Sequence, residues 1–233
     1  MPIKHDFELV FDETEYVEMH GERFAALLER PLIRERFEEV LAEVPDLVEP
    51  AACYESFPIA EYLHDRLRLA NGTRLGGGPV VEVVHGAEEL LVGVCTVGPA
   101  VDERIKAYQT AGQGFQMMVL DELASWAVGQ VRQQLYALFE QEARARGWRV
   151  SSMLSPGESA WSVSDQPAIF SLLDTSSIGV TLNEACVMRP LKSLSLIAGT
   201  GPQPMGAEGL SNCDFCTIQE RCQYRAKHVS AHG

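Results

Sequence analysis

The feature that most constrains the fold is one long stretch without a helix breaker other than a single glycine. From Phe115 to Arg146 the chain has no proline, and only Gly129 disfavours a helix. Apolar side chains recur here three or four positions apart, as one buried helix face requires: Leu120, Leu123, Val131, Leu135 and Leu138. We therefore predict the longest helix of the molecule in this stretch and expect it to pack on a sheet.

The N-terminal third is also predicted to be helical. Residues 21–43 repeat apolar side chains at helical spacing and are interrupted by Pro31, which predicts two short helices or one kinked helix. Pro45 and Pro50 then predict a connector, and residues 57–69 have the pattern of another amphipathic helix. We therefore predict a helical region over residues 1–75.

This N-terminal region carries most of the net charge. Residues 1–65 contain 17 acidic and 5 basic side chains, a net of −12 within a formal charge of −14 for the whole chain. A solvated helix surface explains such a run, and a docking face for a partner protein is the alternative. Binding to a phosphate backbone needs a basic surface, so nucleic acid is not an expected partner.

Glycines and β-branched residues mark a change of structure after residue 75. Gly76–Gly78 predict a turn, and the runs rich in valine that follow predict strands. Ser164 or Asp165 can cap a short helix that accepts Pro167 in its first turn. Apolar residues alternate on both sides of the "RPLK" segment at 189–192, which predicts a β-hairpin.

Neither a membrane span nor a secretory signal is expected. The longest apolar runs, such as "ELLVGVCTVGPAV", are shorter than the roughly 18–20 residues that cross a bilayer. The sequence begins with an acidic segment, whereas a secretory signal is basic and then apolar. We therefore expect a cytoplasmic protein without a membrane partner, and in that reducing compartment clustered cysteines more often bind metal than form disulfides.

Three of the six cysteines lie close together in the C-terminal tail. Cys213, Cys216 and Cys222 have the spacing C-x2-C-x5-C, which lets three thiolates reach one metal centre. Thiolates favour zinc or an iron–sulfur cluster. The spacing also leaves open free or regulatory thiols, and His228 gives a possible fourth ligand for zinc.

An iron–sulfur cluster usually takes four cysteine ligands. The fourth would have to come from Cys53, Cys95 or Cys186, each of which lies among apolar residues and is also explained as a small buried side chain. We expect Cys53 to be the fourth ligand if there is one, because it follows the proline-containing connector. The candidate metal ligands are therefore Cys213, Cys216, Cys222 and Cys53, for a 4Fe-4S cluster or, alternatively, zinc.

The segment 155–199 resembles the activation domain of cobalamin-dependent methionine synthase. Upstream, "VCTVGPAVDERI" and "VLDELASWAV" resemble segments of stand-alone proteins related to that domain, so the resemblance runs in order from about residue 80 to 200. Its landmarks are a Pro-Gly loop, a helix that ends in "LLD", a strand with "L-N-E", and then "M-x-P" and "S-x-S": Pro156, Gly157, Leu172–Asp174, Ile178, Gly179, Leu182–Glu184, Met188, Pro190, Ser193 and Ser195.

The resemblance implies an α+β fold, with a twisted antiparallel sheet flanked by helices. The helical N-terminal region would precede this core over residues 76–200, and a linker with the cysteine-rich tail would follow over 201–233. In that family the domain binds S-adenosylmethionine, which methylates cob(I)alamin after an external donor has reduced the inactive cob(II)alamin.

The adenosylmethionine loop of the family departs from its pattern here. The family reads Arg-Pro-Ala-Pro-Gly-Tyr, and the aligned residues of this chain run from Met153 to Glu158. Pro156 and Gly157 are kept, Glu158 stands at the tyrosine, and the arginine that would meet the ligand carboxylate is absent, so adenosylmethionine binding is in doubt. Glu184 matches the glutamate of the family strand. Pro156, Gly157, Glu158 and Glu184 are thus the candidate cofactor-binding residues, and no catalytic residue is assigned.

Two functions fit these observations. In the first, the chain is an iron–sulfur protein that supports reductive activation of a corrinoid (cobalamin) cofactor by electron transfer. Its partners would be a corrinoid-binding methyltransferase or corrinoid protein and an electron donor. In the second, it is a non-catalytic module that binds a corrinoid or a partner protein, with a structural zinc site in the tail.

Overall fold

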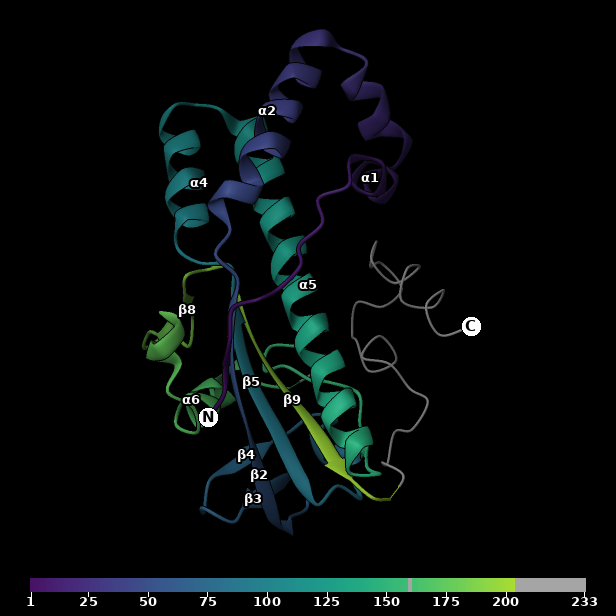
Figure 1. Cartoon of the computed structure of the whole chain (residues 1–233). Helices are drawn as coiled ribbons and strands as arrows, with labels where there is room; N and C mark the ends of the chain where they lie inside the picture. The colour runs from purple at the N-terminus through teal and green to yellow at the C-terminus, as the bar shows by residue number, and fades with distance from the viewer. Residues whose placement is uncertain (159–160, 204–233) are drawn as a thin grey trace.

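The computed structural model describes residues 1–158 and 161–203 (Figure 1). The candidate tail ligands Cys213, Cys216, Cys222 and His228 therefore lie outside the described residues. The described elements, in chain order, are β1 (Ile3–Lys4), α1 (Glu13–Leu28), α2 (Pro31–Leu47), β2 (Ala51–Tyr62), β3 (Arg66–Leu69), β4 (Arg74–Gly76), α3 (Val80–Val84), β5 (Glu89–Thr96), α4 (Ala100–Thr110), α5 (Gly114–Ala145), β6 (Arg149–Val150), η1 (Val163–Asp165), α6 (Gln166–Phe170), η2 (Thr175–Ile178), β7 (Thr181–Leu182), β8 (Met188–Arg189) and β9 (Ser193–Gly201).

An antiparallel sheet is the centre of the fold. Its strand order is β4-β3-β2-β5-β9-β6, and β1 pairs with β2. The two longest pairings join β5 to β2 and to β9, and run over the whole length of β5. With helices on the sheet, this is the α+β class predicted above, so that prediction is confirmed.

The long helix predicted from the sequence is present as α5. Its C-terminal half lies along β5 and β9, while α1, α2 and α4 surround its N-terminal half at one end of the molecule (Figure 1). Buried side chains of α5 form one continuous cluster with residues of both regions, including Phe37 of α2, Leu91 of β5 and Leu196 of β9. One helix therefore holds the helical end and the sheet together.

The opposite face of the sheet is covered by short elements. Val80, Val83 and Val84 of α3, with Trp161 and Ile169, pack against the residues of β5 and β9 that point away from α5. Between β4 and α3, Gly77 and Gly78 form the predicted turn, with φ of 115° and 52°. The sheet is thus sandwiched between one long helix and several short ones.

The N-terminal helices agree in part with the sequence prediction. Pro31 is the first residue of α2 and separates it from α1, so the interpretation as two helices is confirmed. Asp12 begins α1 by accepting a hydrogen bond from the backbone N–H of Glu15 at 2.7 Å. Pro45, predicted to lie in a connector, instead lies inside the last turns of α2.

Two predicted elements have the wrong type. Residues 57–69 are the end of β2 and the strand β3, and not a helix, because β2 pairs with β5 as far as Pro58 and then with β3. In β3 the side chains alternate between buried and partly exposed positions, which is a strand period. Val80–Val84, predicted as strand, form α3, whose buried valines have the spacing i, i+3, i+4 of a helix.

The predicted hairpin across "RPLK" is also wrong. The strand before it, β8, pairs with β7 through a turn at residues 183–187, and the strand after it, β9, joins the main sheet between β5 and β6. The predicted strand after this segment is confirmed as β9, whereas the alternation before it corresponds to β7, a turn and β8 and not to one strand.

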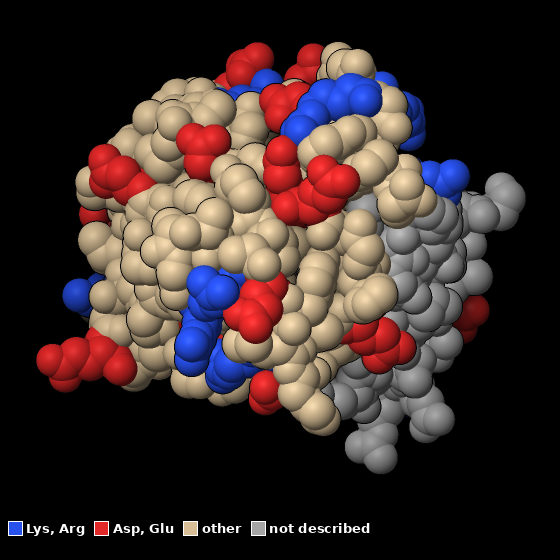
Figure 2. Space-filling model, turned by 90° about the horizontal axis from the view of Figure 1, so that it is seen from below, with Lys and Arg blue, Asp and Glu red and all other residues tan. Residues whose placement is uncertain are grey.

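Charged side chains are mixed on the face seen from below. Lys and Arg lie there in small groups next to Asp and Glu, within a wide surface of other residues (Figure 2). Ion pairs such as Arg68–Glu61 at 2.9 Å and Arg146–Glu89 at 2.8 Å show the same pairing in detail. These arginine side chains are therefore neutralised by neighbouring glutamates.

Candidate functional site

The loop predicted to bind a cofactor follows β6 at the edge of the sheet. Leu154 and Ile197 of β9 exchange backbone hydrogen bonds of 2.9 and 2.8 Å, which continue the sheet by one residue. The chain then turns sharply, because the N–H of Glu158 donates to the carbonyl of Ser155 at 3.0 Å and the N–H of Gly157 to that of Trp161 at 2.8 Å. Gly157 has φ of +96°, a conformation that favours glycine.

The end of this loop is fixed by one buried carboxylate, that of Asp165. It accepts hydrogen bonds from the backbone N–H of Gly76 and from the indole Nε1 of Trp161, both at 2.9 Å. Arg66 of β3 adds an ion pair at 3.2 Å. The sequence predicted Asp165 or Ser164 as a side-chain cap for a helix. Asp165 does precede α6, and Pro167 lies in its first turn, but neither side chain caps the helix, since the Asp165 carboxylate holds the loop against β4.

Two side chains of α5 hold the loop, one at its start and one at its end. The hydroxyl of Tyr136 donates to the carbonyl of Ser151 at 2.8 Å. One turn earlier on the same helix face, the Nη1 of Arg132 lies 2.9 Å from the Oε1 of Glu158. Burial, and next the negative charge of Glu140, raise the pKa of Tyr136 to about 12. Two polar side chains of α5 thus reach the loop.

Two polar atoms at this junction are buried without a partner among the described residues: the hydroxyl of Ser155 and the Nε of Arg132. Ser155 is only 5% exposed, so water has little access to that hydroxyl. Buried polar groups in proteins are nearly always hydrogen-bonded, so such a pair marks a place where a ligand or an ordered water is expected.

Two glycines leave open space beside the same junction. A Cβ placed on Gly157, or on Gly129 one turn before Arg132, would meet no atom of the described residues within 4 Å. By contrast, a Cβ on Gly199 of β9 would lie 2.8 Å from the Cβ of Ala87. The sheet is therefore closely packed at Gly199, whereas an added methyl group at Gly157 or Gly129 would meet no described atom.

The polar face of α5 continues toward its N-terminal half. The Nζ of Lys192, just before β9, lies 2.7 Å from Asp121 and 2.8 Å from the hydroxyl of Ser125. Ser125 precedes Gly129 by one turn and Arg132 by two, so these residues share one side of the helix. The loop 151–158, this side of α5 and Lys192 together form the candidate site.

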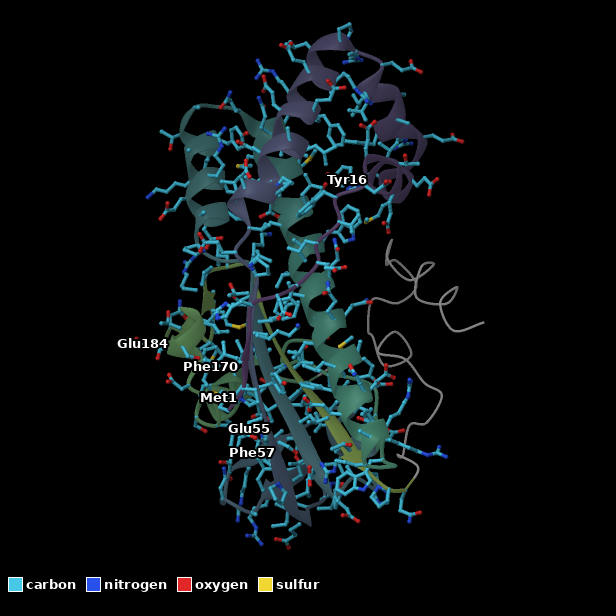
Figure 3. The ribbon with its side chains drawn as sticks, viewed as in Figure 1. Met1, Tyr16, Glu55, Phe57, Phe170 and Glu184 are labelled. Atoms are coloured by element: carbon cyan, nitrogen blue, oxygen red, sulfur yellow. The ribbon has the colours of Figure 1, made fainter. Side chains whose placement is uncertain are left out.

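Glu184 does not belong to this site. It lies in the exposed turn between β7 and β8, where Asn183 holds the turn by accepting from the N–H groups of Ala185 and Val187. In Figure 3 Glu184 lies at the outer edge of the molecule beside β8, whereas α5 runs along the other side of β5. None of the contacts described for the two segments joins Glu184 to Pro156, Gly157 or Glu158.

The described cysteines are unpaired, and two of them are deeply buried. Cys53 is the third residue of β2, directly after the predicted connector, and lies opposite Val94 of β5. Burial, and next the charge of Asp174, raise the pKa of Cys53 to about 11. Metals bind the thiolate, so this position disfavours Cys53 as a ligand. Cys95 is buried in β5, and Cys186 is half-buried in the β7–β8 turn.

Within residues 1–158 and 161–203, no three His, Cys, Asp or Glu side chains are grouped so that they could hold a metal ion. In the same residues, no helix combines the length and apolar character of a membrane span.

Sequence reasoning missed the residues of α5 that complete the site. Arg132 and Tyr136 lie about 20 residues before the loop in sequence, and polar residues on a helix usually face water. Their spacing was a weak signal: Ser125, Gly129, Arg132 and Tyr136 recur at three- and four-residue intervals on one side of the helix, but other polar side chains such as Gln130 and Gln133 lie between them.

These features define an α+β domain with a long helix across an antiparallel sheet and a polar loop at the sheet edge. A solved structure with this fold is the crystal structure of the MetH reactivation domain bound to AdoHcy. The match covers 87% of this chain and 82% of that chain, with a TM-score of 0.55 and 14% sequence identity. The resemblance seen in the sequence is therefore confirmed for the fold. No protein-family model matches the sequence, and a search of curated proteins finds no match.

Proposed function

We propose that this protein supports the reductive activation of a corrinoid cofactor that is held by a partner methyltransferase or corrinoid protein. The observation that carries the proposal is the fold, which resembles a reactivation domain over most of the chain. The sequence landmarks from Pro156 to Ser195 point to the same kind of domain. In this role the core recognises the corrinoid or its carrier, and the cysteine tail supplies reducing equivalents.

The tail is proposed to hold a 4Fe-4S cluster on Cys213, Cys216 and Cys222. Such clusters have reduction potentials between about −700 and +450 mV, a range that includes very low values of the kind that cob(II)alamin reduction needs. One electron would pass from a low-potential one-electron donor protein, by way of the tail, to cob(II)alamin, leaving cob(I)alamin. The fourth ligand is open, because Cys53 and Cys95 are buried in the sheet.

The first test is the metal content and visible spectrum of the full chain purified without oxygen. We expect about four iron and about four sulfide per chain, with a broad absorbance that bleaches on reduction. Serine in place of Cys213, Cys216 and Cys222 should remove iron and colour while leaving the core folded, and Ser211→Ala in the same segment should remove neither. Cys186→Ser tests the half-buried cysteine as the fourth ligand.

The second test is electron transfer. Protein that has been reduced and freed of excess reductant is mixed with cob(II)alamin, and loss of the cob(II)alamin electron paramagnetic resonance signal is followed. We expect about one cob(II)alamin reduced per cluster, and none with the triple serine variant. One zinc per chain and no colour would overturn the electron-transfer proposal. The alternative hypothesis, a corrinoid- or partner-binding module with a structural zinc, would then replace it.

We also infer that the junction of loop 151–158 with α5 binds a small ligand of the adenosyl-amino-acid class, S-adenosylmethionine or its demethylated product. The related solved domain is bound to AdoHcy. In this chain the junction has buried polar atoms without described partners and open space at Gly129 and Gly157. Calorimetry of the full chain with S-adenosylhomocysteine should give saturable binding, and a flat titration would contradict this part of the proposal.

A further inference from the structure

We propose that Arg132 of α5 and Glu158 of the loop together bind the α-amino-acid end of this ligand, with the carboxylate on Arg132 and the ammonium on Glu158. The inference rests on the proposed small-ligand site and names the residues that recognise one part of the ligand. It assigns the recognition of the carboxylate to the long helix, because the loop itself has Met153 where the related family has an arginine.

The geometry of the Arg132–Glu158 pair fits a zwitterion. Nη1 of Arg132 lies 2.9 Å from Oε1 of Glu158, so a positive and a negative group lie side by side at the loop. An α-amino acid carries its carboxylate and ammonium on the same carbon and thus presents one group of each charge to the pair. The guanidinium is a planar fork that binds carboxylates with two parallel hydrogen bonds.

Part of that fork is unused. The Nε of Arg132 is buried and has no hydrogen-bond acceptor among the described residues. An N–H that is kept from water without an acceptor is costly, and a ligand carboxylate would satisfy it. The hydroxyl of Ser155, in the same turn as Glu158, is likewise buried and without a described partner, so it can donate a further bond to the ligand.

A purely structural role explains this pair less well. The loop is already held at Leu154 by the sheet, at Ser151 by Tyr136 and at Trp161 by Asp165. Glu158 is 41% exposed, and a pair with one exposed member adds little to stability. Gly157 is next to Glu158 in the sequence and Gly129 lies one turn before Arg132, and a Cβ at either glycine would meet no described atom within 4 Å.

The test compares two probes on the full-length protein: S-adenosylhomocysteine, and 5′-methylthioadenosine, which has the same nucleoside and sulfur but no amino-acid end. We expect Arg132→Gln to weaken S-adenosylhomocysteine binding about 10-fold or more, as loss of a charge-assisted hydrogen bond does. Glu158→Gln should weaken it about 5-fold by the same reasoning. Binding of 5′-methylthioadenosine should stay within about 2-fold in both variants, since it lacks the groups that this pair recognises.

The matched control is Arg146→Gln at the end of the same helix. Arg146 also pairs with a glutamate, Glu89 at 2.8 Å, and stacks on Trp148, but it does not touch the loop. It should change neither affinity. Circular dichroism and thermal unfolding confirm that each variant is folded, and Arg132→Lys, which keeps the charge without the fork, should restore only part of the affinity.

Three results would overturn the inference: unchanged S-adenosylhomocysteine affinity in Arg132→Gln, equal losses for the two probes, or no binding of S-adenosylhomocysteine to the unaltered protein. In the second case a ligand site exists, but the protein recognises the nucleoside of the ligand and not its amino-acid end. In the third case there is no adenosyl ligand, and the proposed reductive function is still decided independently by the metal content and by electron transfer to cob(II)alamin.

Discussion

Two carboxylates, that of Glu158 at the end of the candidate loop and that of Asp165 beyond it, both meet an arginine, yet their surroundings differ. Asp165 is 9% exposed and accepts hydrogen bonds from the backbone of Gly76 and from the Trp161 indole as well as from Arg66. Glu158 is 41% exposed, and Arg132 is its only described side-chain partner. The Asp165 carboxylate already has all the hydrogen-bond donors that it needs, so its role is structural. Arg132 and Glu158 have fewer partners, so each can exchange the other for a group of a ligand.

Removal of the Asp165 carboxylate should have the largest effect on stability. Asp165→Ala leaves the Gly76 N–H and the Trp161 indole without acceptors and removes the partner of Arg66, so we expect the free energy of unfolding to fall by about 3 kcal/mol. Glu158→Ala should cost about 0–1 kcal/mol, as exposed pairs do. Urea unfolding followed by circular dichroism measures both, and equal losses would contradict the contrast between the two carboxylates.

The sequence was sufficient for the parts of the fold with local signals. The long apolar period from Phe115 to Arg146 predicted α5, and Pro31 separated α1 from α2. Residues 57–69 were misread because their apolar spacing allows either a helix or a strand, and only pairing with β5 and β3 decides between them. Likewise, β9 could be recognised as a strand but not assigned to its neighbours, and the turn that separates β7 from β8 was not predicted.

The candidate site also has one part that the sequence could predict and one part that it could not. Pro156, Gly157 and Glu158 could be found because they form one short motif. Arg132 belongs to a different element, and nothing in a single sequence shows which loop a helix face meets. Glu184 was expected on a strand by its match to the related family, while the fold places it in an exposed turn, so its position could not be predicted from the motif and its cofactor role stays a prediction.

The second prediction concerns the hydrogen bond from Tyr136 that holds the start of the loop, and its contribution to the free energy of unfolding. Tyr136→Phe removes the hydrogen bond to the Ser151 carbonyl and should lower the free energy of unfolding by about 1 kcal/mol at pH 7. The pKa of Tyr136 is raised to about 12 from 10, so folding favours the protonated phenol. Its contribution is complete below about pH 10 and is lost as the pH rises toward 12.

The measurement is the difference in unfolding free energy between the unaltered protein and Tyr136→Phe at a series of pH values from 7 to above 10. Other buried groups titrate in the same range, including Tyr62 with a pKa of about 12, and they cancel in the difference. The stability of the unaltered protein should fall more steeply with rising pH than that of the variant, by at most about 1.4 kcal/mol per pH unit for one proton. Parallel curves would mean that Tyr136 is not buried as described.

Gly129→Ala should give the smallest change in stability and sharpens the comparison at the ligand side. The added Cβ meets no described atom within 4 Å, and alanine is the better helix former, so we expect the free energy of unfolding to rise by about 0.5–1 kcal/mol. Because Gly129 lies one turn before Arg132 on the same helix face, the methyl group would also enter the proposed ligand space and weaken S-adenosylhomocysteine binding. Gly114→Ala, at the first turn of α5, has equally open surroundings and should leave that binding unchanged. A variant that gains stability and loses affinity at Gly129 alone would show that this glycine is kept for the ligand, whereas unchanged affinity in both would place the ligand away from α5.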